Sequence, residues 1–523
     1  MTNGSTGASP SPTPRQVSSP ERQRRIWWVM ASLMMAMLLA SLDQMIFGTA
    51  LPTIVGELDG VDHMMWIITA YLLAETIMLP IYGKLGDVVG RKMLFIVALI
   101  IFMAGSIVGA VAHSMAALII GRGIQGVGGG GLMILSQAII ADVVPARERG
   151  KYMGVMGGVF GLSAVLGPLL GGWFTEGPGW RWAFWINIPL GIIAIAIAAA
   201  KLQVHQPAAR NVRWDWWGTV WMATSATSLI LFCTWGGSRY AWGSPVILGL
   251  IGLFVLSAVL LVVVELRAEE PLVPMEFFAN RNFAVVTAAG LVIGITMFGV
   301  LGYLPTYLQM VHALNATEAG YMMIPMMVSM MGFSIWTGQR ITKTGTYKAY
   351  PLIGLAVVFV ATLLFSTLSP ATSLWTIGGY LFLLGIGLGL AMQVLVLVVQ
   401  NTLPLQVVGS ATAVNNFFRQ IGGSIGSALV GGLFVGNLTD LLAQRMPALP
   451  AGAAAVDSNA ITPQLVQQLP ENIRDVVIGA YNDALTPVFF SVLPMVVIAF
   501  VLLLGVKHEK LREHTLEDEL TGS

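Results

Sequence analysis

Uncharged apolar stretches of about 20 residues recur along almost the whole chain, and no other feature restricts the fold more strongly. A helix of about 20 residues is long enough to cross the hydrocarbon core of a bilayer. Only 10% of the 523 residues are charged, whereas soluble domains are about one quarter charged. We therefore expect an all-α integral membrane protein.

The apolar stretches predict fourteen membrane spans. They cover residues 27–50, 64–83, 93–112, 116–140, 153–174, 183–200, 216–235, 244–264, 283–304, 319–338, 349–368, 375–399, 411–435 and 487–506. The residues before the first span are rich in Ser, Thr, Pro and Gly, which is typical of a disordered tail. The first apolar run is too long for a signal peptide and lacks a small-residue cleavage pattern, so it should remain as a span.

Lys and Arg residues are distributed unevenly between the predicted loops. Most of the 27 lie in the N-terminal tail, the even-numbered loops and the C-terminal tail. Because positive charge marks the cytoplasmic side, both termini are expected to be cytoplasmic. The net charge of +1 gives no reason to invoke nucleic acid, and the single cysteine, Cys233, excludes an internal disulfide.

A loose internal repeat suggests how the spans are grouped. GKLGDVVGRK (83–92) follows the second span and GQRITKTGTYK (338–348) follows the tenth. If spans seven and eight are an insertion, each loop joins the second and third spans of a six-span block, an arrangement common in transporters. We predict a disordered cytoplasmic tail, a six-helix bundle, two inserted helices, a second six-helix bundle and a cytoplasmic tail, with bounds 1–25, 26–201, 202–270, 271–508 and 509–523. The second bundle would carry a long extracellular loop at 437–486.

Asp43, in the stretch SLDQMIFGTALP, is a carboxylate inside the first span. It lies about 16 residues, or roughly 24 Å, from the cytoplasmic start of that span. Arg122 lies roughly 9 Å below the outer surface, at a similar depth in a core about 30 Å thick. Intramembrane charges commonly pair, so we expect a contact between Asp43 and Arg122, directly or through Gln125 or water. The pair could be a fixed structural ion pair or a proton site coupled to conformation.

Glu75, in YLLAETIMLP, lies roughly 15 Å into the second span, near the middle of the membrane. No basic residue of that span can neutralise it. A carboxyl in this position can hold a proton and release it when water or a cationic substrate enters. Proton release and substrate binding would then compete, as exchange requires. The alternative is that Glu75 faces a polar crevice and only hydrates the cavity.

Five motifs resemble signatures of the major facilitator superfamily, and in particular of its fourteen-span drug:proton antiporters. They are SLDQMIFGTALP, GKLGDVVGRK, LIIGRGIQGVGGG (118–130), GVFGLSAVLGPLLGG (158–172) and WRWAFWINIPLG (180–191). The resemblance implies the major facilitator fold, with two six-helix bundles plus two inserted helices. It also implies a monomer in the bacterial cell membrane that exchanges protons for small molecules, with the proton gradient in place of a cofactor.

The resemblance also implies roles for three groups of residues. Proton coupling would rest on Asp43, Glu75 and Arg122. A conformational latch between the halves, favouring the outward-open state, would consist of Gly83, Asp87, Gly90, Arg91 and Lys92. A pliable helix between the halves would use Gly157, Gly161, Gly167, Pro168, Gly171 and Gly172. The alternatives are a plain topology signal for the loop, in which Asp87 caps a helix terminus, and simple close packing for the glycines.

The sequence gives a weaker signal for the substrate cavity. The candidate residues are Gln125, Asn415, Phe418 and Arg419. A buried arginine usually needs a partner, and the sequence does not identify one for Arg419.

Three classes of function fit a chain of this kind. The leading hypothesis is a proton-coupled antiporter that exports lipophilic, often cationic small molecules by alternating access, giving multidrug efflux and antibiotic resistance. The alternative is a dedicated exporter of one endogenous metabolite or lipid. The third class, a membrane enzyme, is disfavoured because the sequence has no Walker-type loop, no HExxH and no metal-spaced Cys/His set.

Overall fold

The computed structural model describes residues 20–58, 63–202, 214–237, 239–445 and 463–511. Within these ranges every regular element is helical, apart from one isolated bridge between Gly236 and Tyr240. Most of the predicted N-terminal tail and the end of the C-terminal tail lie outside the described residues.

Helix lies over each predicted span, and several helices extend well beyond the predicted bounds. Their bounds are α1 (Pro20–Glu57), α2 (Met64–Val89), α3 (Arg91–Ala110), α4 (Met115–Val143), α5 (Ala146–Glu176), α6 (Trp182–Trp185), α7 (Asn187–Lys201), α8 (Trp216–Trp235), α9 (Pro245–Glu265), α10 (Glu276–Ala279), α11 (Arg281–Leu301), α12 (Leu304–Val311), α13 (Ala316–Tyr321), α14 (Ile324–Thr344), α15 (Ala349–Phe365), α16 (Leu374–Thr402), the 3₁₀ turn η2 (Leu405–Val407), α17 (Val408–Arg445), α18 (Pro463–Gln468) and α19 (Glu471–Leu504).

Eleven helical segments in the described ranges are long and apolar enough to cross a membrane. The predicted spans at 153–174, 216–235 and 349–368 fall on α5, α8 and α15, which are helical but are not among these eleven. The count of fourteen spans therefore stays a prediction.

Local sequence sets several helix ends. The Ser114 side chain accepts a hydrogen bond from the Ala117 N–H at the start of α4, and Asn315 and Glu318 form a reciprocal capping box at the start of α13. Gly90 separates α2 from α3 with φ of 106°, a conformation that glycine adopts without a steric penalty.

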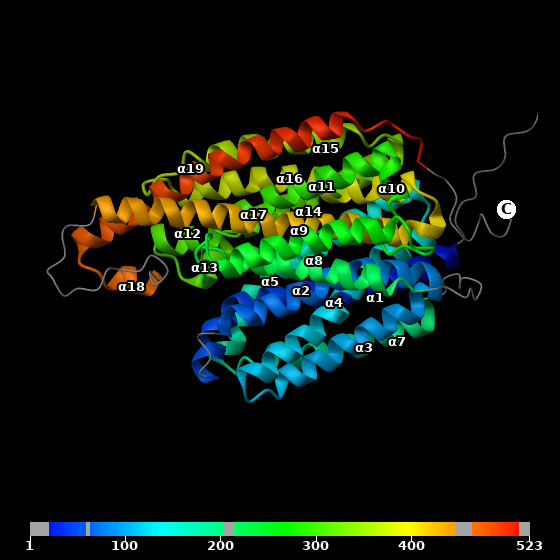
Figure 1. Cartoon of the computed structure of the whole chain (residues 1–523), viewed down its shortest axis with the longest axis horizontal. Helices are drawn as coiled ribbons and strands as arrows, with labels where there is room; N and C mark the ends of the chain where they lie inside the picture. Colours follow the sequence, from blue (N-terminus) through cyan, green and yellow to red (C-terminus); the bar gives the residue numbers. More distant parts are fainter. Residues whose placement is uncertain (1–19, 59–62, 203–213, 238, 446–462, 512–523) are drawn as a thin grey trace, which may run out of the picture.

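Helices from the two halves of the chain form two groups (Figure 1). In the first group α1 packs on α5 and α7, while α4 packs on α2 and α3; in the second, α11 packs on α17 and α19, and α16 packs on α14 and α15. The most extensive contacts between the groups are those of α5 with α14 and of α2 with α17. The α8/α9 hairpin lies beside this seam and contacts α2 and α17 through α8. The bounds predicted for these parts are not tested by the packing and stay a prediction.

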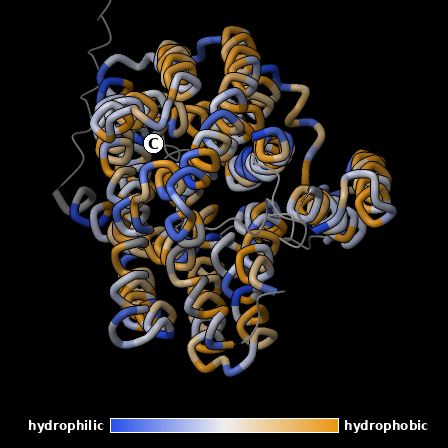
Figure 2. The backbone as a smooth tube through the Cα atoms, turned by 90° about the vertical axis from the view of Figure 1, so that its left-hand side faces the viewer, coloured by the Kyte–Doolittle hydropathy of each residue, from blue (hydrophilic) through white to orange (hydrophobic). Residues whose placement is uncertain are grey.

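The outer surface is as apolar as a bilayer requires. Figure 2 looks along the helices and shows hydrophobic residues on the peripheral helices as well as inside. In α9, Leu248, Val255, Leu256 and Val259 are all more than half exposed. An apolar surface that covers the whole length of a helix favours contact with lipid.

Helix extends into the predicted loop at 437–486 from both sides, and the place of this segment outside the membrane stays a prediction. Helix α17 continues to Arg445 and α19 already begins at Glu471, with residues 446–462 outside the described ranges. Both extensions bury apolar side chains, among them Leu442 and Val477. Amphipathic helix therefore continues beyond the apolar window by which the spans were predicted.

Candidate functional site

Asp43 is the centre of a buried polar cluster on five helices, the Asp43 cluster. Asp43 comes from α1, Arg122 and Gln125 from α4, Ser106 from α3 and Asn187 from α7, and Arg122 also reaches a carbonyl of α2. Asp43 is completely buried and Arg122 is 2% exposed. Because each helix contributes a side chain or carbonyl, the cluster links most of the first group of helices.

Every polar atom of Asp43 has a defined partner. Arg122 donates to Asp43 Oδ2, while Gln125 and Asn187 donate to Asp43 Oδ1 at 2.9 and 3.1 Å. Gln125 also accepts from Arg122 at 2.9 Å. The expected approach of Asp43 and Arg122 therefore occurs both directly and through Gln125.

Two aromatic rings enclose the guanidinium of Arg122. Its central carbon lies 4.3 Å from the ring centroid of Phe47 and 4.3 Å from that of Tyr71. Cation–π contacts of this kind stabilise a charge that has been withdrawn from water. Arg122 is thus fixed by an ion pair, a side-chain amide and two rings.

Glu75 lies beside the Asp43 cluster but has a different kind of partner. Glu75, on α2, is 2% exposed, and its Oε2 accepts a hydrogen bond of 2.7 Å from Gln44 on α1. Gln44 is the neighbour of Asp43 in sequence, and Tyr71 lies one turn before Glu75. The two carboxyls thus share neighbours, yet Asp43 is paired with a cation and Glu75 with a neutral amide.

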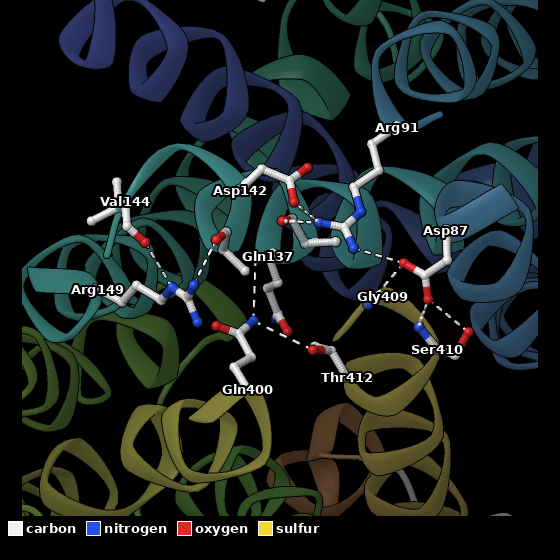
Figure 3. Close-up of polar contacts among 12 residues, drawn as sticks. Asp87, Arg91, Gln137, Asp142, Val144, Arg149, Gln400, Gly409, Ser410 and Thr412 are labelled. Atoms are coloured by element: carbon white, nitrogen blue, oxygen red, sulfur yellow. Dashed lines mark hydrogen bonds and ion pairs between the residues drawn. The ribbon is translucent and has the colours of Figure 1, made fainter. Parts of the chain in front are cut away.

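The predicted latch residue Asp87 contacts the second half of the chain directly (Figure 3). Asp87 Oδ2 accepts from the Ser410 N–H at 2.7 Å and the Ser410 hydroxyl at 2.8 Å, and Oδ1 accepts from the Gly409 N–H at 3.1 Å. These groups belong to the first turn of α17, where free N–H groups and the helix dipole favour an anion. Asp87 therefore caps the helix with which α2 packs.

Arg91 connects Asp87 to α4. It donates to Asp87 Oδ1 at 2.6 Å and to the Ala138 carbonyl at 2.8 Å, and it forms an ion pair with Asp142. Asp142 is 7% exposed and was not among the predicted site residues. The other predicted latch residues lie nearby: Lys92 donates to the Ala199 carbonyl at 2.9 Å, and a Cβ at Gly83 would contact Ala413 of α17.

Further polar contacts close the same end of the molecule. Gln400 of α16 donates to the Gln137 carbonyl of α4 at 3.2 Å, and Asn416 of α17 donates to the Gln137 side chain at 3.0 Å. We call this end, where α2 stops and α17 begins, the Asp87 end. The two halves of the chain are in direct contact there.

The glycines of α5 allow close approach to α14. An added Cβ would lie 3.0 Å from Ser334 at Gly157 and 3.4 Å from Met327 at Gly161. Gly167 instead faces Met45 of α1. Gly172 is near Thr317, and Gly171 is buried. Pro168 falls within the bounds of α5, and its side chain lies outside the described residues.

The tightest contact between α5 and α14 was missed because it needs a glycine from each helix. A Cβ at Gly338 would contact the carbonyl of Gly150 and lie 2.9 Å from the Lys151 nitrogen. Neither Gly150 nor Gly338 lies in a recognised stretch of small residues. Two helices can approach this closely only where both lack a side chain.

We predict that Gly338→Ala lowers the thermal stability of the purified protein, because overpacking of a close contact costs about 1–3 kcal/mol. Gly332→Ala is the matched control: it lies on the same helix, and a Cβ there would meet nothing within 4 Å. The control should be neutral or slightly stabilising, since alanine favours helix over glycine by about 1 kcal/mol. Thermal unfolding in detergent measures both, and equal melting temperatures for the two variants would contradict the prediction.

A cavity of about 770 Å³ lies at the end opposite Asp87. Its walls come from the start of α2, the ends of α8 and α11 and the middle of α17, and include Leu72, Cys233, Phe298 and Gln420. It is therefore bounded by both halves of the chain and by the inserted hairpin.

The four predicted cavity residues do not line this space. Gln125 belongs to the Asp43 cluster, and Asn415 donates to Thr287 at 3.4 Å. Phe418 packs against Phe278 with ring centroids 5.8 Å apart. Arg419 donates to Asn416, which is the partner that the sequence did not identify. Their part in substrate binding stays a prediction.

Some residues of the site could not be recognised as functional from the sequence alone. Ser106 and Asn187 are ordinary small polar residues in apolar helices, and only the fold brings them to Asp43. Gln44 was recognisable only as the polar neighbour of Asp43. In the described part of the chain no group of three or more His, Cys, Asp or Glu side chains could hold a metal ion.

Comparison with known proteins identifies the family. Residues 33–427 match the family model described as Major Facilitator Superfamily. An uncharacterized transporter of this type from Mycobacterium tuberculosis is 37% identical over 96% of this chain and 72% of its own length. Multidrug transporter protein MdtP of Bacillus subtilis is 36% identical over 96% of this chain and 97% of its own.

A solved structure agrees at the level of the fold. The human organic anion transporter MFSD10 superposes with a TM-score of 0.62 over 93% of this chain and 100% of that chain, at 15% sequence identity. With the apolar helices and the family match, this makes the protein a multi-pass membrane transporter. The chain belongs to the major facilitator superfamily.

Proposed function

We propose that this transporter is a proton-coupled antiporter that exports lipophilic, often cationic small molecules by alternating access. The observation that carries the proposal is the contrast between its two neighbouring buried carboxyls. Asp43 is bound by Arg122, whereas among the described residues the partner of Glu75 is the neutral Gln44 amide. A carboxyl that can gain and lose a proton beside a fixed ion pair is what exchange against a proton requires.

Glu75 is the proton carrier in this proposal. Asp43 accepts hydrogen bonds on both oxygens, and one of its three donors is the cationic guanidinium of Arg122. Protonation of Glu75 would leave the Asp43 cluster intact and would need only rotation of the Gln44 amide. Asp43 then serves to hold Arg122 and to orient α1 against α4.

The direction of opening follows from the two ends of the molecule. Basic residues such as Arg91, Lys92 and Lys151 gather at the Asp87 end, which we assign to the cytoplasm. The contacts of Asp87 and Gln400 close this end, while the cavity lies at the other. This supports an outward-facing conformation, which breaking of the latch would convert to an inward-facing one.

The relatives support export of drug-like molecules. MdtP is named a multidrug transporter, and a second Bacillus subtilis relative, 32% identical, is named multidrug resistance protein 3. The cavity wall is largely apolar, with Trp242 and Tyr303 beside aliphatic residues. Such a surface binds lipophilic molecules of different shapes without directional contacts.

Purified protein in proteoliposomes with an imposed pH gradient tests the proposal. We expect several lipophilic cationic dyes to move against their concentration gradient only while the proton gradient runs the other way. Collapse of the gradient with a protonophore should stop this movement, because substrate cannot be concentrated without a coupled ion. Transport that is indifferent to the proton gradient would refute proton coupling. Transport of a single metabolite or lipid, with no dye moved, would favour a dedicated exporter.

A further inference from the structure

Two carboxyl groups meet at the base of the α8/α9 hairpin, away from the Asp43 cluster. Asp215 precedes α8, and its Oδ1 accepts a hydrogen bond of 2.8 Å from the Gly218 N–H. Glu265 ends α9, is 3% exposed, and its Oε2 accepts a hydrogen bond of 3.0 Å from the Val273 N–H. One oxygen of each carboxyl is thereby used to organise the local backbone.

The second oxygen of each carboxyl is buried without a donor. Neither Asp215 Oδ2 nor Glu265 Oε1 accepts a hydrogen bond from any described residue. Both point to the same place, because a Cβ at Gly218 would contact Asp215 Oδ2 and would lie 2.7 Å from Glu265 Oε1. The absence of a side chain at Gly218 is what allows the two oxygens to converge.

Among the residues that the structure describes, no cation forms an ion pair with Asp215 or Glu265. The charged groups whose fields reach Glu265 most strongly are Asp215 and Lys84 of α2. The Lys84 ammonium is already paired with Glu270, 2.7 Å away, in the segment after α9. Two ionised carboxylates at such close range repel each other, and in a buried place water does not screen that repulsion.

We propose that Asp215 and Glu265 bind one proton between Asp215 Oδ2 and Glu265 Oε1, at a site distinct from Asp43 and Glu75. A hydrogen on either oxygen donates to the other, which satisfies both buried acceptors and removes one negative charge. The proton also stabilises the entry to the second half of the chain, because Glu265 holds Val273 in the segment that leads to α10 and α11. The site follows from the packing of the hairpin and does not depend on which substrate is transported.

Amide substitutions test the shared proton in the full-length protein. Asp215→Asn and Glu265→Gln each keep the acceptor that holds the backbone N–H, and each supplies a permanent donor where the proton would be. We expect wild-type stability to fall, relative to both variants, as pH rises from about 5.5 to about 8.5, because unfolding separates the carboxyls and releases the proton. The melting temperature in detergent should diverge by about 2 °C or more over this range.

An infrared measurement gives a readout that a merely structural role would not change. The difference spectrum between wild type and either variant at neutral pH should contain the carbonyl stretch of a protonated carboxylic acid. Gly218→Ala should remove the same band, because its Cβ would occupy the space where the oxygens meet. Glu276→Gln is the control, since it removes an exposed carboxylate outside the pair and leaves the Lys84–Glu270 ion pair in place, and it should keep both the band and the wild-type pH profile.

Two outcomes would overturn the proposal. If the band is absent and the pH profiles of wild type and both variants run in parallel, the pair holds no proton. If Na⁺, compared with choline at equal ionic strength, stabilises wild type but not the variants, a metal cation occupies the site instead.

Discussion

Glu75→Gln is expected to abolish proton-driven efflux while the protein still folds and reaches the membrane. The amide keeps the size of the side chain and can still bond with Gln44, but it cannot release a proton. Gradient-driven accumulation should therefore fall about tenfold or more, since even a tenfold loss corresponds to only about 1.4 kcal/mol of coupling free energy. Downhill exchange of labelled substrate should continue, because that exchange needs no proton.

Two further variants make this experiment specific. Glu57→Gln is the control on α1: Glu57 is exposed and accepts hydrogen bonds of 2.6 Å from Arg181 and Trp180, and the bond from Arg181 lowers the pKa of its carboxyl. Exposed pairs contribute little, so this variant should transport normally.

Asp43→Asn should reduce stability as well as transport, because it leaves the Arg122 charge buried without a counter-ion. The opposite result would make Asp43 the proton carrier: Glu75→Gln keeps proton-driven accumulation, whereas Asp43→Asn loses proton-driven accumulation and keeps its stability.

The sequence predicted the pairing of Asp43 with Arg122 because depth along a membrane helix can be read from residue count. Each helix rises by a fixed amount per residue, and the bilayer brings charges at one depth together. The same reasoning placed Glu75 near mid-membrane but could not supply Gln44 as its partner. Rotation about the helix axis, which decides such contacts, depends on packing and not on depth.

The sequence predicted only some of the contacts between the two halves of the chain. The resemblance of GKLGDVVGRK to a known loop pointed to Asp87, but its partners Gly409 and Ser410 bond mainly through backbone N–H groups, which carry no sequence signal. Asp142 was overlooked because a carboxylate at the end of a predicted span is ordinary. The carboxyls of Asp215 and Glu265 are about fifty residues apart, and only the hairpin makes them neighbours.

Asp87→Asn is expected to open the Asp87 end of the molecule and to slow transport. The carboxylate accepts four hydrogen bonds, from Arg91, Gly409 and twice from Ser410, whereas an amide has one acceptor and would turn its NH₂ group toward a donor. Hydrogen bonds to a charged group contribute about 1.5–3 kcal/mol each. Because the three bonds from Gly409 and Ser410 exist only while the halves are in contact at this end, their loss shifts the equilibrium toward the open form by about tenfold or more.

Labelling of an introduced cysteine measures this shift. Thr337, on α14, is 1% exposed at the contact with α5, so Thr337→Cys in a Cys233→Ser background should react slowly with a maleimide while this end is closed. Adding Asp87→Asn should raise the labelling rate about tenfold, in proportion to the open population. Glu276→Gln, which removes an exposed carboxylate at the same end, should leave the rate unchanged.

An unchanged rate with Asp87→Asn would mean that the glycine contacts of α5 and α14 hold the halves together without the latch. Transport slowed without faster labelling would instead place the role of Asp87 in a later step of the cycle.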